Sequence, residues 1–443
     1  MKLFKFKASS VYGYMNFHIN FNKDVSFLTG SNGSGKSTVI KLMQAIFLVN
    51  IKELTSIPFE SIEMVYEERN RIFKITAVKD KISLKISIDS EEGIIEIPII
   101  NHDNFIGSSN NDDYYLHIER DMITNKVYKK IKGTIPPVFL GLDRKSYGLE
   151  SDVFENDMTL AARKEIYAYK KGLRKNTPIT GSLADALLSV QMILQEQYRK
   201  IREFEDKQAL YLRDRILKSS FKFSSFEEVK ITDNQLNWQD KRDILKRRQE
   251  ITDAVKKIGS SDRSLILDIE KFFDKLEHLF NELSHEKGFS IEWLLNKAQI
   301  DRISDILEVI DEYNDKTEKM YKPISNFLHA INSFLLDSKK KIEIDTVGRL
   351  IVVRADNKKC GIDILSSGER QLVVLIANVM LNKYTHISRV IIIDEPEISL
   401  HLKWQERFSE TIISINPETQ FILATHSPDI VGELTDKCLR VGG

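Results

Sequence analysis

The hydrophobic positions near the start of the chain alternate with polar ones. Short alternating runs cover residues 2–28 and 61–100, where Lys-Asp and Glu-Glu-Gly turns separate them, and a further apolar run lies at 136–144. Alternation with a period of two is typical of half-buried β-strands. We therefore expect the N-terminal part of the chain to be rich in strands.

The pattern becomes helical near residue 158. The stretch 183–217 has no Gly or Pro and carries charge pairs that suit an exposed helix, and helical patterns continue from about 236 to 336. The expected breaks are Gly259, Gly288 and Pro323. Because no heptad pattern is sustained, we expect a helical lid or a short arm rather than a long coiled coil.

Strand character returns towards the end of the chain. It covers 340–356, 389–401 and 419–431, and an apolar helix is expected at 372–381. Neither end of the chain alone carries a full set of strands. The pattern therefore predicts an α/β head built jointly from residues 1–157 and 338–443, with residues 158–337 as a helical insertion.

Composition narrows the class of protein. The chain has 443 residues, 65 Lys and Arg against 65 Asp and Glu, and two cysteines without metal-site spacing. Its length predicts more than one lobe, and its balanced charge excludes a chain that attracts polyanions as a whole. We find neither a signal peptide nor an apolar stretch long enough to cross a membrane, so we expect a cytoplasmic protein.

A glycine-rich loop follows the apolar run 25–28. Its sequence, GSNGSGKST, fits the pattern G-x-x-x-x-G-K-[ST], and an apolar helix follows it. Such a loop brings backbone N–H groups and a lysine to phosphate oxygens, and its serine can bind Mg²⁺. A flexible Gly/Ser turn is the alternative, which the flanking strand and helix disfavour. The expected phosphate-binding residues are Gly30, Ser31, Asn32, Gly33, Ser34, Gly35, Lys36, Ser37 and Thr38.

A second strand ends in acidic residues. Four apolar β-branched residues at 390–393 indicate a buried parallel strand, and Asp394 and Glu395 follow at its carboxyl end. We expect Asp394 to hold Mg²⁺ together with Ser37. Glu395 would orient the attacking water and accept its proton. A strand that merely ends in a charged turn is the alternative.

Two further sequence motifs fit the hypothesis of a phosphate-binding site. The run LSSGERQ at 365–371 places Ser367 and Gly368 at the start of an apolar helix, and His426 follows the short apolar run 421–424. The serine and glycine suit a phosphate at a helix N-terminus, and His426 could contact the γ-phosphate. An ordinary helix cap by Ser366 or Ser367 is compatible with this interpretation.

Together, these four motifs resemble the ATP-binding-cassette superfamily, and within it the SMC/RecF/OLD branch. The resemblance covers the head and implies an ABC-type P-loop ATPase whose cofactors are ATP and Mg²⁺. It also implies that two heads enclose two ATP molecules. Lys36, Glu395 and His426 would act on ATP in one subunit, while Ser367 and Gly368 would bind the same ATP in trans from the other.

The superfamily's glutamine loop has no clear counterpart. Gln191 and Gln195 lie within a predicted helix, and Asp143 with Arg144 is a weak substitute. Two tyrosines near the N-terminus, Tyr12 and Tyr14, could stack on adenine, but we favour packing in the core or at its edge.

The chain also resembles stand-alone ATPases of bacterial antiphage systems, such as AriA of PARIS and PtuA of Septu. No nuclease motif follows His426, so we expect the chain to control a separate effector, a nuclease or a toxin. The resemblance implies that it does so as a homodimer or higher oligomer joined through its heads. A RecF-like DNA clamp is the alternative. Two basic segments, 163–175 and 241–248, could contact nucleic acid or form solvated helix faces.

Overall fold

The computed structural model describes residues 1–99, 117–118, 120–141, 146–147, 182–220, 243–257, 263–285 and 291–442. These residues form two compact units, Met1–Gln195 with Ile324–Gly443, and Glu196–Pro323. We call them the head unit and the helical unit. The predicted boundary at 157/158 lies outside the described residues.

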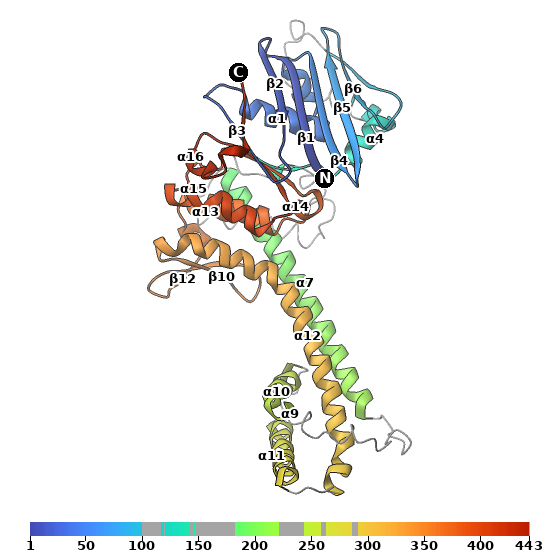
Figure 1. Cartoon of the computed structure of the whole chain (residues 1–443), viewed down its shortest axis with the longest axis vertical. Coiled ribbons are helices and arrows are strands. Elements are labelled where there is room, and N and C mark those ends of the chain that lie inside the picture. The colour runs from blue at the N-terminus through green and yellow to red at the C-terminus, as the bar shows by residue number, and fades with distance from the viewer. Residues whose placement is uncertain are drawn as a thin grey trace. The chain divides into compact units, whose positions relative to one another are not determined.

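An antiparallel sheet forms one layer of the head unit (Figure 1). Its order is β2-β1-β4-β5-β6-β7, and each strand pairs with its neighbour in antiparallel fashion. The buried side chains alternate along β4 and β5, as expected for a sheet with one face against a core. The strands are β1 (Lys2–Val11), β2 (Met15–Asn20), β4 (Ser61–Glu68), β5 (Arg71–Lys79), β6 (Ser83–Ile88) and β7 (Ile95–Pro98).

A second sheet, of order β15-β3-β14-β13-β8-β9, is parallel except for β9. Its central strands β13 and β14 are buried throughout, which explains their unbroken apolar sequences. The strands are β3 (Val25–Thr29), β8 (Val138–Leu140), β9 (Ser146–Tyr147), β13 (Val390–Asp394), β14 (Gln420–Ala424) and β15 (Cys438–Arg440).

Both ends of the chain therefore build this sheet, because β3 pairs with β14 and β15. The predicted α/β fold, with a head assembled from N- and C-terminal parts, is confirmed. A smaller antiparallel sheet contains β10 (Lys341–Ile344), β11 (Leu350–Val353) and β12 (Lys359–Cys360).

One buried glutamine joins the two large sheets. The side chain of Gln420, at the start of β14, accepts a hydrogen bond from the Leu3 N–H at 2.7 Å and donates to the Leu3 carbonyl at 2.8 Å. It also donates to the Asn22 carbonyl at 2.6 Å. Because its amide is fully buried, these bonds satisfy polar atoms that would otherwise be costly to bury.

Helices of the head unit fill the space around the sheets. Helix α1 contacts β13 and α4, while α4 contacts β6, so one apolar core links both sheets. Helix α13 is buried almost all round, which matches its run of apolar residues. The helices are α1 (Lys36–Leu48), α2 (Ile51–Ser56), α4 (Lys126–Gly133), α13 (Ser367–Met380), α14 (Lys383–Ser388), α15 (Leu402–Ile415) and α16 (Pro428–Val431).

Two long helices, α7 (Ser182–Ser220) and α12 (Ile291–Leu335), contribute to both units. In the helical unit, residues 196–220 of α7 and 291–323 of α12 share an apolar core with the shorter helices. This core includes Leu212, Phe273, Phe280 and Ile310. The shorter helices are α9 (Asp243–Lys246), α10 (Arg248–Lys257) and α11 (Arg263–His285).

The expected break at Pro323 is wrong, because α12 continues through this residue. Proline removes one hydrogen bond to the carbonyl four residues earlier, that of Lys319. Both Pro323 and Lys319 are exposed, so water can satisfy that carbonyl and the helix tolerates the residue. The other two expected breaks, at Gly259 and Gly288, lie outside the described residues.

Candidate functional site

The glycine-rich loop lies between β3 and α1, as the sequence predicts. Gly35 has a left-handed backbone with φ of 94°, and a Cβ there would lie 2.6 Å from the Phe17 ring. Any side chain would therefore be strained and would collide with the packed β2 hairpin. The sharp turn lets Lys36 begin the helix.

The Lys36 ammonium folds back over this loop. Its Nζ donates to the carbonyls of Gly30, at 2.9 Å, and Ser31, at 3.3 Å, and the residue is only 5% exposed. Burial lowers the pKa of Lys36, while nearby carboxylates act in the opposite direction; these belong to Glu395, Asp394 and Glu397. A buried ammonium held by neutral carbonyls is suited to an anion such as a phosphate.

The start of α1 has the properties of an anion site. No side chain caps it, and its first turn carries no acidic residue. Its first N–H groups have no partners within the helix, and the helix dipole makes this end positive. The Ser34 hydroxyl nearby is buried without a hydrogen-bond partner among the described residues. Residues 30–38 therefore fit the triphosphate of ATP.

Ser37 and Asp394, which are 357 positions apart in the sequence, lie side by side. The Ser37 hydroxyl donates to Oδ1 of Asp394 at 3.2 Å, and Asp394 is 6% exposed at the end of β13. A hydroxyl and a carboxylate are oxygen ligands of the kind that Mg²⁺ prefers, with phosphate oxygens and water as the remaining ligands. The pair therefore fits the expected magnesium site.

Glu395, the residue after Asp394, has a strained backbone conformation. Its φ of 46° is left-handed, which is uncommon for a residue with a side chain. Its N–H donates to the Ala424 carbonyl at 2.8 Å, so the backbone continues the pairing of β13 with β14 before it turns. The parallel register also places Thr425 and Thr29 at this sheet edge.

Helix α13 begins with a capping box. The Ser366 hydroxyl accepts a hydrogen bond from the Glu369 N–H, and the Glu369 carboxylate accepts one from the Ser366 N–H at 2.6 Å. Ser366 is therefore the cap, which leaves the neighbouring Ser367 exposed. A Cβ on Gly368 would overlap the backbone carbonyl of Ser399, so glycine is required here for packing within the chain. The predicted contact in trans stays a prediction.

His426 lies just beyond the end of β14, as expected. Its side chain is exposed, and its backbone N–H donates to Oε1 of Glu397 at 2.6 Å. Sequence reasoning assigned no role in hydrolysis to Glu397, although it is the third acid of the run Asp-Glu-Pro-Glu. That repeated acid was the available signal.

The remaining predictions have mixed outcomes. Tyr12 and Tyr14 are 49% and 72% exposed at the turn between β1 and β2, so packing in the core is wrong for both, while packing at its edge stays a prediction. Stacking on adenine stays a prediction.

The candidates for the glutamine loop have separate outcomes. Asp143 and Arg144 lie outside the described residues. Gln191 is buried in α7, where its amide bonds the Gly348 carbonyl and the Leu350 N–H, which is a structural role.

The basic segment 241–248 is described from residue 243. Arg247 pairs with Glu250 and Asp311, and Arg248 pairs with Asp274 at 2.8 Å. These arginines therefore link α10 to α11 and α12. Their guanidinium groups are already paired with carboxylates of the helical unit. The other basic segment, 163–175, lies outside the described residues.

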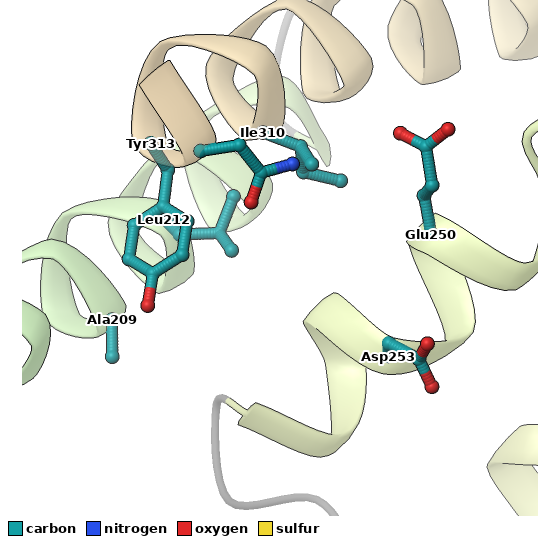
Figure 2. A pocket seen from close by; sticks show the side chains of 7 residues that line it. Ala209, Leu212, Glu250, Asp253, Ile310 and Tyr313 are labelled. Carbon is teal, nitrogen blue, oxygen red and sulfur yellow. The ribbon is translucent and has the colours of Figure 1, made fainter. Parts of the chain in front are cut away.

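The helical unit contains a cavity of about 220 Å³ (Figure 2). Glu250 and Asp253 line it from α10, and the opposite walls come from α7 and α12, with Leu212, Ile310 and Tyr313. Glu250 pairs with Arg247, and Asp253 accepts a hydrogen bond from Gln249 at 3.1 Å. No residue of the four motifs lines this cavity.

Comparison with known proteins assigns the family. A model of the AAA ATPase domain matches residues 1–431. The chain belongs to this AAA ATPase family. The expected membership of an ATPase family is thereby confirmed, while the finer resemblance to AriA and PtuA stays a prediction.

This AAA ATPase also resembles individual proteins. The probable ATPase of retron Vc95, from Vibrio cholerae serotype O1 biovar El Tor, is 25% identical over 198 residues, which cover 39% of this chain and 38% of that protein. The match thus spans well under two thirds of the relative's length.

Among solved structures, the Smc head domain of Pyrococcus furiosus, with an extended coiled coil and bound to the C-terminal domain of ScpA, gives a TM-score of 0.39 at 12% identity. This match covers 97% of the present chain and 91% of the Pyrococcus furiosus chain. The SMC head domain from Thermotoga maritima gives a TM-score of 0.36 at 12% identity, with the same coverage.

In the part of the chain that the structure describes, no helix combines the length and the apolar character that crossing a membrane requires.

Proposed function

We propose that this AAA ATPase binds ATP with Mg²⁺ and hydrolyses it to ADP and phosphate. The observation that carries the proposal is the hydrogen bond between Ser37 and Asp394, which joins the glycine-rich loop to the acidic end of β13. The uncapped start of α1 supports the same conclusion, since its N–H groups suit the phosphates.

The residues divide the chemistry among them. Lys36 and the loop N–H groups would bind the phosphate oxygens, and Mg²⁺ between Ser37 and Asp394 would neutralise part of their charge. Water attacks the γ-phosphorus, the bond to the bridging oxygen of ADP breaks, and the water's proton passes to Glu395. His426 would contact the γ-phosphate.

We further propose that ATP joins two copies through their heads, with Ser367 and Gly368 of each copy facing the nucleotide of the other. The exposure of Ser367 supports this arrangement, because an exposed residue is open to contact with a partner. The protein would then act in the cytoplasm as a sensor or scaffold that controls a separate effector, a nuclease or toxin, in antiphage defence. Its similarity to the probable ATPase of a retron supports a role alongside other protein components.

A DNA clamp of the RecF kind is the second candidate. In the described part of the basic segment 241–248, Arg247 and Arg248 are engaged with carboxylates of the same unit. Contact with phosphates of nucleic acid would have to break these pairs, so this segment favours the defence role.

Phosphate release from ATP tests the enzymatic proposal. The wild-type protein should release phosphate in the presence of Mg²⁺, and Glu395→Gln should bind ATP with similar affinity but lose at least about a hundredfold in kcat, because the amide cannot accept the proton. Exchange of the exposed Glu410 for Gln serves as the matched control. Unchanged turnover in Glu395→Gln would refute Glu395 as the base.

A further inference from the structure

The carboxylate of Glu397 connects two segments of the proposed hydrolysis site. Its Oε1 accepts the backbone N–H of His426 at 2.6 Å, although the two residues are 29 positions apart. Glu397 lies two residues after Glu395 in the turn that follows β13, whereas His426 follows β14. A hydrogen bond to an ionised acceptor at this distance is a strong one.

A second connection runs in parallel through Gln405 of α15. Its Nε2 donates to the Leu400 carbonyl at 2.8 Å, and its Oε1 accepts the Ser427 hydroxyl at 2.7 Å. Ser427 in turn caps α16 by accepting N–H bonds from Asp429 and Ile430. The turn after β13 and the loop after β14 are thus held together at two neighbouring points. We call Glu397, Gln405, Ser427 and the His426 N–H the Glu397 clamp.

The two oxygens of Glu397 have different surroundings. While Oε1 holds the His426 N–H, Oε2 is buried and has no hydrogen-bond partner among the described residues. The carboxylate is therefore fixed mainly through a single acceptor oxygen. A glutamine side chain offers the same acceptor without the negative charge, which makes the hydrogen bond and the charge separable by substitution.

We propose that Glu397 is a positioning residue for ATP hydrolysis, which fixes the loop of His426 relative to Glu395. The inference rests on the proposed ATPase function. Glu397 itself does not touch the reacting atoms; it sets where His426 meets the γ-phosphate. A displacement of about 1 Å at a reacting group can cost up to about a hundredfold in rate, so loss of the clamp should lower kcat.

Steady-state phosphate release by the wild type, Glu397→Ala and Glu397→Gln separates the hydrogen bond of Glu397 from its charge. Glu397→Ala removes the hydrogen bond, and we expect kcat to fall about tenfold or more with KM for ATP within about twofold of the wild type. Glu397→Gln keeps an oxygen for the His426 N–H, and we expect it to retain most of the wild-type kcat. Equal losses in the two variants would assign the effect to charge and overturn the proposal.

Thermal unfolding of the same proteins excludes a purely structural effect. We expect Glu397→Ala to unfold close to the wild-type Tm; a fall in Tm that accounts for the lost activity would overturn the positioning role. Gln405→Ala weakens the clamp from the other side and should lower kcat in the same direction at unchanged KM. If Glu397→Ala does not fold, wild-type kcat in Gln405→Ala contradicts the clamp.

The two proposals fail in different ways. Absence of phosphate release by the wild-type protein would overturn the ATPase function, and the clamp with it. Wild-type release together with wild-type kcat in Glu397→Ala would overturn the clamp alone and leave the ATPase function intact.

Discussion

The surroundings of Lys36 show what the site requires of a ligand. Its ammonium is almost fully buried and meets two carbonyls of its own loop, while burial lowers its pKa. Neutral carbonyls compensate a buried charge less well than a phosphate would. Phosphate binding therefore replaces weak partners of the lysine with a strong one.

Replacement of Lys36 by Ala should weaken ATP binding. Hydrogen bonds to charged groups contribute about 1.5–3 kcal/mol, so we expect Kd to rise roughly ten- to hundredfold or binding to disappear. Titration with a fluorescent ATP analogue measures the change. Lys41→Ala, which removes an exposed lysine of the same helix, is the control and should bind normally. Equal affinity in both variants would contradict the loop assignment.

Gly368 has a structural reason for its identity. Since a Cβ would overlap the Ser399 carbonyl, Gly368→Ala must push α13 away from the turn that contains Glu395 and Glu397. We expect a loss of about 1–3 kcal/mol in the free energy of unfolding, measured by urea denaturation. Gly133→Ala is the matched control, because no atom lies within 4 Å of a Cβ there. Equal stability of the two variants would contradict this packing.

At the scale of elements, the start of α13 depends on an ionised side chain. The Glu369 carboxylate, 4% exposed, pairs with Lys340 at 2.8 Å and accepts the Ser366 N–H. Burial raises the pKa of Glu369, but the hydrogen bonds from Lys340 and Ser366 outweigh it and hold the pKa below its usual value of 4.5. The ionised form is therefore bound more tightly in the folded protein.

This shift predicts an acid-sensitive stability. A carboxyl whose pKa is depressed by folding stabilises the protein above its unfolded pKa, near 4.5, and loses this contribution as pH falls through the folded pKa. Glu369→Gln keeps the capping box but loses the ion pair, so we expect a deficit of about 1–3 kcal/mol at pH 7. Chemical denaturation between pH 7 and 3.5 should show this deficit shrinking below pH 4.5. A constant deficit would contradict the ion pair.

Elements with local signals could be predicted from the sequence. The apolar run before Asp394 predicted a buried parallel strand, and the glycine-rich loop predicted the start of α1; both are confirmed. The course of α12 through Pro323 was not predictable, because the exposure of Pro323 and Lys319 depends on tertiary structure. Likewise, no local pattern indicated that Arg247 and Arg248 pair with other helices.

At the scale of the whole molecule, the site depends on contacts between distant parts of the sequence. The pairing of β3 with β14, and the bonds from Gln420 to Leu3, join the two ends of the chain. Motif order implied that Ser37 and Asp394 meet, since both follow strands of one sheet. The Glu397 clamp could not be predicted: the repeated acid of Asp-Glu-Pro-Glu does not indicate its partner, because a side chain that bonds a distant backbone N–H leaves no periodic pattern.

The mass of the Glu395→Gln variant in solution tests most directly whether ATP joins two copies. Light scattering after gel filtration should give twice the chain mass of 51.2 kDa in Mg²⁺ and ATP, because binding without hydrolysis preserves the joined state. With ADP, the mass should return to that of one chain. The same mass with ATP, with ADP and without nucleotide would contradict the account.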